Sequence, residues 1–142
     1  MIDLDRTQRE LRNEGLDGWL LYDFQGIDPI ARQAAGIDAK KFLTRRWFCL
    51  IPREGGARWL VHAIERAQFE GVPGEVATYA RRTELESGLR ALVAGGIPAA
   101  GAGAAPRPRL AMEYSPGANV PYISRIDAGT LELVRSSTGA EI

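Results

Sequence analysis

Apolar and polar positions alternate along the chain with two periodicities, one typical of helices and one typical of strands. From Leu4 to Leu11 the side chains recur at the spacing of one helix face, and Gly15 can end that helix in a left-handed conformation. Residues 18–22 then form a short apolar run typical of a buried strand. A helix followed by a glycine and a buried strand predicts an α/β layer fold.

The next segment predicts a loop, a second helix and a hairpin. Residues 23–29 leave the first strand as a loop, and Pro29 can take the first position of a helix that runs toward Gly36. Two strand-like runs follow at 45–52 and 57–62. The paired glycines between them can supply the positive φ that a hairpin turn needs, so we expect these strands to pair.

The middle of the chain predicts a short helix at 63–71 and a strand at 75–79. A longer helix should then begin at a capping box formed by Thr83 and Glu86, in which each side chain satisfies the other's backbone N–H. The glycine pair at 95–96 should end this helix.

The last third predicts one loop, one strand and one helix. Residues 97–109 are rich in Ala, Gly and Pro, which favours a flexible surface loop, and residues 110–114 predict a strand. Asp127 or Thr130 can cap a final helix that Gly139 ends.

The final residues, 140–142, resemble the first step of a further strand. We therefore expect that the chain is cut from a longer polypeptide. Its 142 residues, of which 45% are hydrophobic, suffice for one domain with its own core, spanning 1–142.

Charge and targeting patterns narrow the range of partners. The 18 basic and 18 acidic residues cancel, so no general field attracts nucleic acid or an anionic membrane. The amino terminus lacks the apolar segment of a signal peptide, and no apolar run approaches the length of a membrane span. We expect no nucleic-acid or membrane partner and a cytoplasmic location.

Residues able to carry catalysis are few. The single cysteine, Cys49, lies in an apolar run and is expected to be a small buried hydrophobe. The single histidine, His62, falls where a strand passes into a helix. It is interpreted either as a capping or packing residue or as a contact at a ligand or subunit interface. No Gly-x-Ser-x-Gly nucleophile elbow is present, and the chain is expected to hold no catalytic residue.

One spacing resembles a metal site. Asp17 and Asp28 stand eleven positions apart, as two carboxylate ligands do in two-metal aminopeptidases. Such a centre also needs a histidine and two glutamates well downstream, and His62 lies too close in sequence. Asp17 is more simply a polar turn residue, and no metal ligand is expected in this chain.

Polar and aromatic residues beside strand ends are the remaining candidates for contacts, because such loops are favoured positions for binding. They are Asp23, Phe24, Gln25, Asp28, Lys40, Lys41, Arg45, Arg46 and Trp47. Two interpretations stay open for the last three. They form a contact surface, or the two arginines are a solvated strand start and the tryptophan belongs to the core.

Five blocks of sequence resemble one known family in order and register. They are 22–31 (YDFQGIDPIA), 43–48 (LTRRWF), 60–65 (LVHAIE), 112–116 (MEYSP) and 121–130 (PYISRIDAGT). Together they are similar to the amino-terminal domain of a bacterial Xaa-Pro dipeptidase (prolidase) subgroup of the creatinase/prolidase/methionine aminopeptidase, or pita-bread, metallopeptidases. The last two blocks form the most specific part of this resemblance.

The resemblance implies a three-layer α/β fold with a mixed, about six-stranded sheet flanked by helices. It covers only the first part of the family's enzymes. Their catalytic pita-bread domain, absent from this chain, holds two divalent metal ions, commonly Mn, Co or Zn. None of the metal ligands of that domain can be carried onto a position here, so no cofactor is expected on this chain.

The resemblance also implies a supporting role. Such a domain pairs with its own carboxy-terminal catalytic domain, helps build a homodimer, and walls the active-site entrance against substrates longer than short Xaa-Pro peptides. Candidate cleft or dimer contacts are Asp23, Phe24, Gln25, Asp28, Arg45, Arg46, Trp47 and His62. The alternative is a free-standing or degenerate binding or dimerisation module without peptidase activity.

Overall fold

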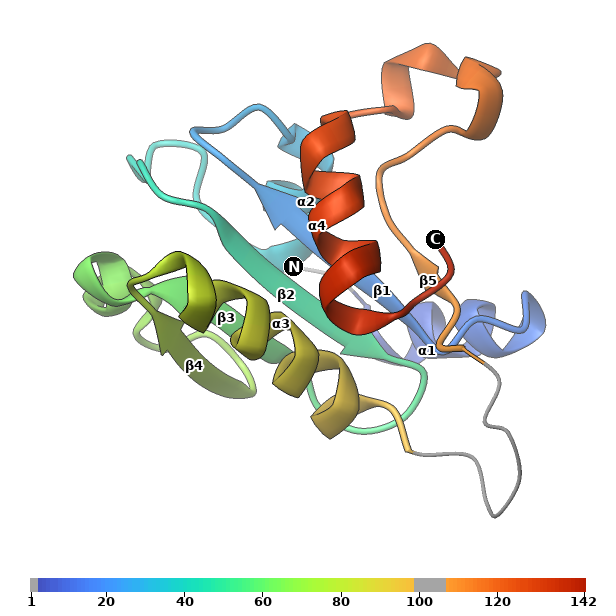
Figure 1. Ribbon diagram of the computed structural model, residues 1–142, viewed down its shortest axis with the longest axis horizontal. Coiled ribbons are helices and arrows are strands. Elements are labelled where there is room, and N and C mark those ends of the chain that lie inside the picture. Colours follow the sequence, from blue (N-terminus) through green and yellow to red (C-terminus); the bar gives the residue numbers. More distant parts are fainter. Residues whose placement is uncertain (1–2, 99–106) are drawn as a thin grey trace.

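The computed structural model describes residues 3–98 and 107–142, and a five-stranded sheet in the order β4-β3-β2-β1-β5 forms its centre (Figure 1). Strand β2 is antiparallel to both of its neighbours, whereas the other four strands run in one direction. The strands are β1 Gly18–Asp23, β2 Trp47–Pro52, β3 Arg58–His62, β4 Glu75–Tyr79 and β5 Leu110–Ala111. The carboxyl ends of β1, β3 and β4 therefore meet the start of β2 at one edge.

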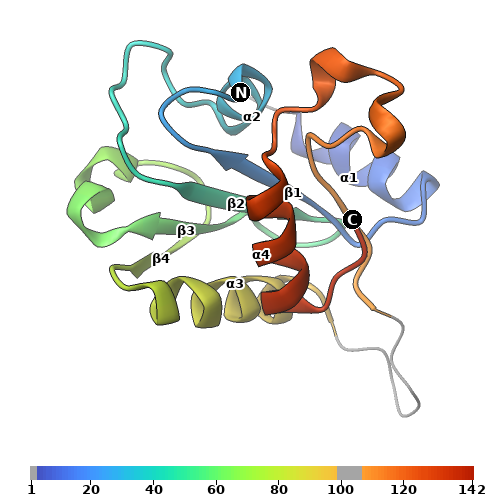
Figure 2. The same cartoon turned by 45° about the horizontal axis from the view of Figure 1, so that its top comes forward.

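Helices cover both faces of this sheet, which confirms the predicted three-layer α/β fold (Figure 2). Helices α3 (Arg82–Gly96) and α4 (Ala128–Thr138) pack on one face. The other face carries α2 (Pro29–Ala35) and the 3₁₀ helix η1 (Ala63–Phe69), with α1 (Leu4–Asn13) beside them. Two further 3₁₀ turns, η2 (Pro116–Ala118) and η3 (Pro121–Ile123), precede α4.

Alternating side chains divide the core into two clusters. Leu20, Leu50 and Leu60 point toward α3 and α4, whereas their chain neighbours Cys49 and Val61 point toward α2 and η1. All six residues of β2 are buried, because helices cover both faces of the sheet. Cys49 is 1% exposed, which confirms its expected role as a core residue.

Several predicted helix boundaries are confirmed by their hydrogen bonds. Asp28 caps α2 through Oδ1, which accepts from the Ala31 N–H at 3.0 Å, and Pro29 follows at the first helical position. Asp127 caps α4 by accepting from the Thr130 N–H at 2.8 Å. Gly139 ends that helix at φ +70°.

The predicted capping box at the start of α3 is wrong. Helix α3 begins at Arg82, and Glu84 Oε2 accepts from the N–H groups of Ala80 and Arg81 at 2.8 and 3.1 Å. Glu84 lies in the first turn and can reach back to these two amides. Thr83 is the second residue of the helix and does not cap it.

Three elements are shorter than predicted by two or more residues. Strand β2 begins at Trp47 and not at Arg45, the segment 63–71 is helical only to Phe69, and the predicted strand 110–114 ends at Ala111. The last of these stops because the chain turns, with the Tyr114 N–H donating to the Met112 carbonyl at 2.7 Å.

The predicted loop at 97–109 falls mostly outside the described residues. The resemblance implied about six strands, and the described residues form five. Glu141 makes an isolated parallel bridge with Arg109 beside β5, in line with the strand start predicted at 140–142. None of the helices in the described ranges is long and apolar enough to cross a membrane.

One close backbone approach gives a testable prediction. Gly74 has φ +97°, and a Cβ atom there would lie 1.9 Å from the Ala57 carbonyl oxygen. Gly55 has a similar φ of +91° but open space around it. Gly55→Ala should lower the free energy of unfolding by about 1 kcal/mol through backbone strain alone, and Gly74→Ala by about 2–3 kcal/mol. Equal losses in urea unfolding would refute the proposed steric contact with Ala57.

Candidate functional site

The edge where β1, β3 and β4 end and β2 begins is hollowed and basic. A cavity of about 260 Å³ opens there. Its lining residues are Phe24, Arg45, Arg46, His62, Tyr79, Ala80, Arg81, Arg82 and Leu85. Four predicted site residues thus come together from three segments of the chain. Phe24 follows β1, Arg45 and Arg46 precede β2, and His62 ends β3.

The two arginines that precede β2 are held by contacts from neighbouring elements. Glu65, on η1, accepts at Oε1 from the N–H and the hydroxyl of Thr44, both at 2.7 Å, and at Oε2 from the Arg45 N–H at 3.2 Å. The Tyr79 hydroxyl donates to the Arg46 carbonyl at 2.7 Å. These bonds hold the backbone on both sides of Arg45. The side chains of Arg45 and Arg46 therefore extend from a fixed stretch of backbone.

His62 caps η1 and also lines the hollow. Its Nδ1 accepts from the Ile64 N–H at 3.2 Å, which confirms the capping interpretation and leaves Nε2 as the nitrogen that can donate. The ring packs edge-on against Tyr79, with centroids 5.1 Å apart. Burial raises the pKa of Tyr79 to about 12, so its hydroxyl stays protonated and neutral.

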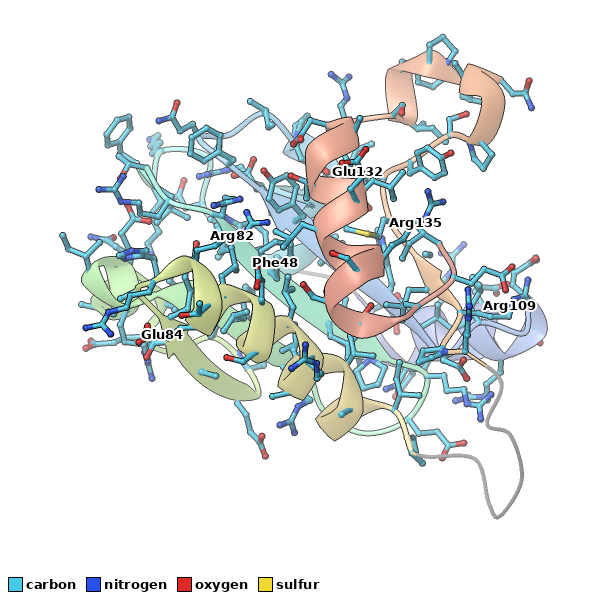
Figure 3. The ribbon with its side chains drawn as sticks, in the orientation of Figure 1. Phe48, Arg82, Glu84, Arg109, Glu132 and Arg135 are labelled. Carbon is cyan, nitrogen blue, oxygen red and sulfur yellow. The ribbon has the colours of Figure 1, made fainter. Side chains whose placement is uncertain are left out.

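Sequence reasoning missed the two arginines on the opposite wall. Arg81 is the last residue before α3. Arg82 is the first residue of that helix (Figure 3). Arg82 Nε pairs with Glu86 Oε1 at 2.7 Å on the helix surface. Their place directly after the predicted strand 75–79 was the available signal, because parallel strands bring their carboxyl ends to the same edge.

The chemistry of this hollow is that of an anion site. Four arginines are among its lining residues, and none of the lining residues is an aspartate or a glutamate. Arginine binds carboxylate or phosphate through paired, parallel hydrogen bonds. The lining contains no serine, threonine or cysteine nucleophile, so the arrangement can hold a negatively charged group but offers no means of attacking one.

Three predicted contact residues lie inside the chain. Asp23 and Asp28 are both 0% exposed, and Trp47 is 1% exposed. Asp23 Oδ2 pairs with Arg32 Nη1 at 3.3 Å and accepts from the Gly26 N–H at 3.1 Å. Trp47 packs on the rings of Trp59 and Phe69, which supports the core interpretation for this residue. Their polar and aromatic groups shape the loop and the core, and we assign them no contact role.

Gln25 lies apart from the basic hollow. It lines a second, open hollow of about 550 Å³ together with Lys41, Phe42 and residues of α2. Its backbone has φ +57°, a left-handed conformation that turns the chain between β1 and α2.

The residues that the structure describes do not fit a two-metal centre. Asp17 precedes β1 and Asp28 follows it, so a strand of six residues separates them by roughly 20 Å. Asp17 instead binds the Arg109 N–H at 2.9 Å and pairs with Arg53 at 3.3 Å. Across residues 3–98 and 107–142, no three His, Cys, Asp or Glu side chains are grouped so as to hold a metal ion.

Comparison with known proteins gives a structural likeness. No family model and no curated protein matches the sequence. The creatinase/prolidase N-terminal domain of an X-Pro dipeptidase from Streptococcus pyogenes matches with a TM-score of 0.65 at 13% identity, over 97% of this chain and 94% of that one. The N-terminal domain of the Lactobacillus brevis Xaa-Pro dipeptidase matches with a TM-score of 0.63 at 10% identity, over 98% and 90%.

A longer enzyme shows how much of such a protein the chain spans. The prolidase from Pyrococcus horikoshii matches with a TM-score of 0.60 at 14% identity, over 96% of this chain but only 30% of that one. The chain therefore spans about a third of that enzyme. At these identities the likeness concerns the fold, and the chain has the fold of the amino-terminal domain of creatinase/prolidase enzymes.

Proposed function

We propose that this chain is the non-catalytic amino-terminal domain of an Xaa-Pro dipeptidase-like metallopeptidase. The observation that carries the proposal is the basic hollow, which lies at one sheet edge of a creatinase/prolidase-type fold. An Xaa-Pro dipeptide ends in a free carboxylate, and a hollow lined by several arginines suits that group. The hydrolytic centre, with two divalent ions such as Mn, Co or Zn, is expected in a carboxy-terminal domain.

The surface around the hollow supports contact with another protein domain. Large apolar side chains are exposed in the segments that follow β1 and β3 and precede β2, with Phe24 37%, Ile27 46%, Phe42 83% and Ile64 74% exposed. Exposed apolar groups gathered at one edge favour a protein interface. We propose that this edge meets the catalytic domain of a second subunit in a homodimer, where it walls the cleft and limits substrate length.

The gene beyond codon 142 provides the first test. An in-frame continuation that encodes two aspartates eleven positions apart, a histidine and two glutamates would support the peptidase assignment. A stop codon at that point would contradict it and favour the free-standing binding module.

The arginines of the hollow provide the second test, in the full-length polypeptide. Arg45→Gln and Arg46→Gln should each raise KM for Xaa-Pro dipeptides by about tenfold and leave kcat nearly unchanged, because one charge-assisted hydrogen-bond pair to the substrate carboxylate is lost. Dipeptide amides, which lack that carboxylate, should show no such rise.

Arg90→Gln is the matched control, because Arg90 is exposed on α3 and does not line the hollow. Its KM should equal that of the parent enzyme. An unchanged KM in both Arg45→Gln and Arg46→Gln would contradict the proposed contact between these arginines and the substrate carboxylate.

A further inference from the structure

Two buried carboxyl groups meet where the loop after β1 packs on the segment after β5. Asp28 is 0% exposed and Glu113 is 5% exposed, and the two carboxyl groups lie close enough for each to affect the ionisation of the other. The basic hollow does not include either residue. Asp28 and Glu113 belong to two parts of the chain that are distant in sequence, the loop after β1 and the segment after β5.

Each carboxyl group has one oxygen satisfied by a conventional donor. Asp28 Oδ1 accepts from the Ala31 N–H at 3.0 Å, and Glu113 Oε1 accepts from Trp19 Nε1 at 2.7 Å. Within the described ranges, no amide, hydroxyl or cationic donor reaches Asp28 Oδ2 or Glu113 Oε2. A proton shared between the two groups satisfies both oxygens, because ionised carboxylates only accept hydrogen bonds and repel each other.

The charges around the pair do not replace that proton. Asp23, at the end of β1, adds a further negative charge that disfavours ionisation of Asp28. The nearby cation, Arg32 on α2, is already bound to Asp23 Oδ2 at 3.3 Å and to the carbonyls of Asp38 and Lys41, both at 2.8 Å. From β1, the other polar group facing the pair is the neutral indole of Trp19.

We propose that Asp28 and Glu113 share one proton at neutral pH, and that loss of this proton loosens the junction between residues 24–28 and 112–115. Glu113 is the carrier. Burial raises the pKa of Asp28 as well, but the Ala31 N–H and the helix dipole at the amino terminus of α2 favour its anion. Burial, and then the neighbouring Asp28, raises the pKa of Glu113 from 4.5 to about 8.

The direction of the pH effect follows from proton linkage. Between pH 4.5 and about 8 the folded chain keeps a proton on Glu113 that the unfolded chain has released. The contribution of this pair to stability should therefore fall as pH rises through this window, and level off above about 8. The loop that would loosen contains Phe24, which lines the basic hollow. Loss of the proton should therefore also alter one wall of that hollow.

The direct test is a ¹³C NMR titration of the side-chain carboxyls in the 142-residue chain. Glu113 should titrate near pH 8, and its titration should shift the amide signals of residues 24–28. A Glu113 midpoint near the ordinary value of 4.5 would overturn the proposal, and this measurement needs no variant.

Glu113→Gln gives the independent test, because the amide can donate permanently to Asp28 Oδ2 while its oxygen still accepts from Trp19. The unfolding equilibrium constant of the parent should rise relative to that of the variant by up to about tenfold per pH unit across the window. The variant should be the more stable protein at pH 8.

Glu132→Gln is the control, because Glu132 is an exposed glutamate on α4 (Figure 3). Its pH profile should follow that of the parent. Parallel profiles for the parent and Glu113→Gln would overturn the proposal. So would a stabilisation by Na⁺ or Ca²⁺ at pH 8 that disappears in Glu113→Gln, since a cation would then hold the pair together instead of a proton.

Discussion

Replacing Asp23 by alanine should lower the free energy of unfolding by about 3–5 kcal/mol, because the change leaves the Arg32 guanidinium buried without a counter-charge. The Arg32 and Asp23 side chains are 9% and 0% exposed, and their atoms are 3.3 Å apart. Asp23 also accepts from the N–H groups of Gly26 and Asp28, which the loop would lose. Urea unfolding at pH 7 measures the effect.

The controls for Asp23 separate a buried charge from an ordinary ion pair. Glu86→Ala removes an exposed pair with Arg82, whose side chains are 43% and 60% exposed, and should cost at most about 1 kcal/mol. Asp23→Ala combined with Arg32→Met should cost less than the sum of the single changes, because no unpaired charge remains. A loss below about 1 kcal/mol for Asp23→Ala would contradict the buried pair.

Replacing Trp47 by alanine should also cost about 3–5 kcal/mol, as expected for the loss of a large aromatic side chain from a packed core. The indole is 1% exposed and lies 5.8 Å from the Trp59 ring and 6.3 Å from the Phe69 ring, between centroids. Trp47→Phe should cost much less, because most of the ring volume stays and the indole N–H, which has no partner among the described residues, is removed.

Phe42→Ala is the control for Trp47, since Phe42 is 83% exposed. It should change the free energy of unfolding by no more than about 0.5 kcal/mol. If Trp47→Ala were equally mild, the core position of Trp47 would be wrong and the surface-contact interpretation would return. The contrast therefore decides between the two interpretations that the sequence left open.

The candidate site could be predicted only in part. Phe24, Arg45, Arg46 and His62 were found from their positions beside strand ends, and they line one hollow. Arg81 and Arg82 were missed. The predicted helix start was placed at Thr83, so these two arginines were not recognised as residues of the strand-end loop where α3 begins. Asp23 and Asp28 were predicted as cleft or dimer contacts, whereas both side chains are buried.

Local patterns in the sequence determined the layer architecture. Short apolar runs specify buried strands, and Asp, Pro and Gly specify where helices begin and end, because these effects act within a few neighbouring residues. The runs at 18–22 and 75–79, the Asp28-Pro29 helix start and the Gly139 helix end could all be read in this way. The neutral composition excluded a general attraction for anions.

Tertiary structure alone decided which polar groups meet. The partners Asp23 and Arg32, Asp28 and Glu113, and Thr44 and Glu65 lie 9, 85 and 21 positions apart in sequence. Burial of a charge is tolerated only when a partner arrives from another element, and no local pattern reveals that partner. The sheet order brings four arginines to one edge in the same way, so the basic hollow is a property of the fold.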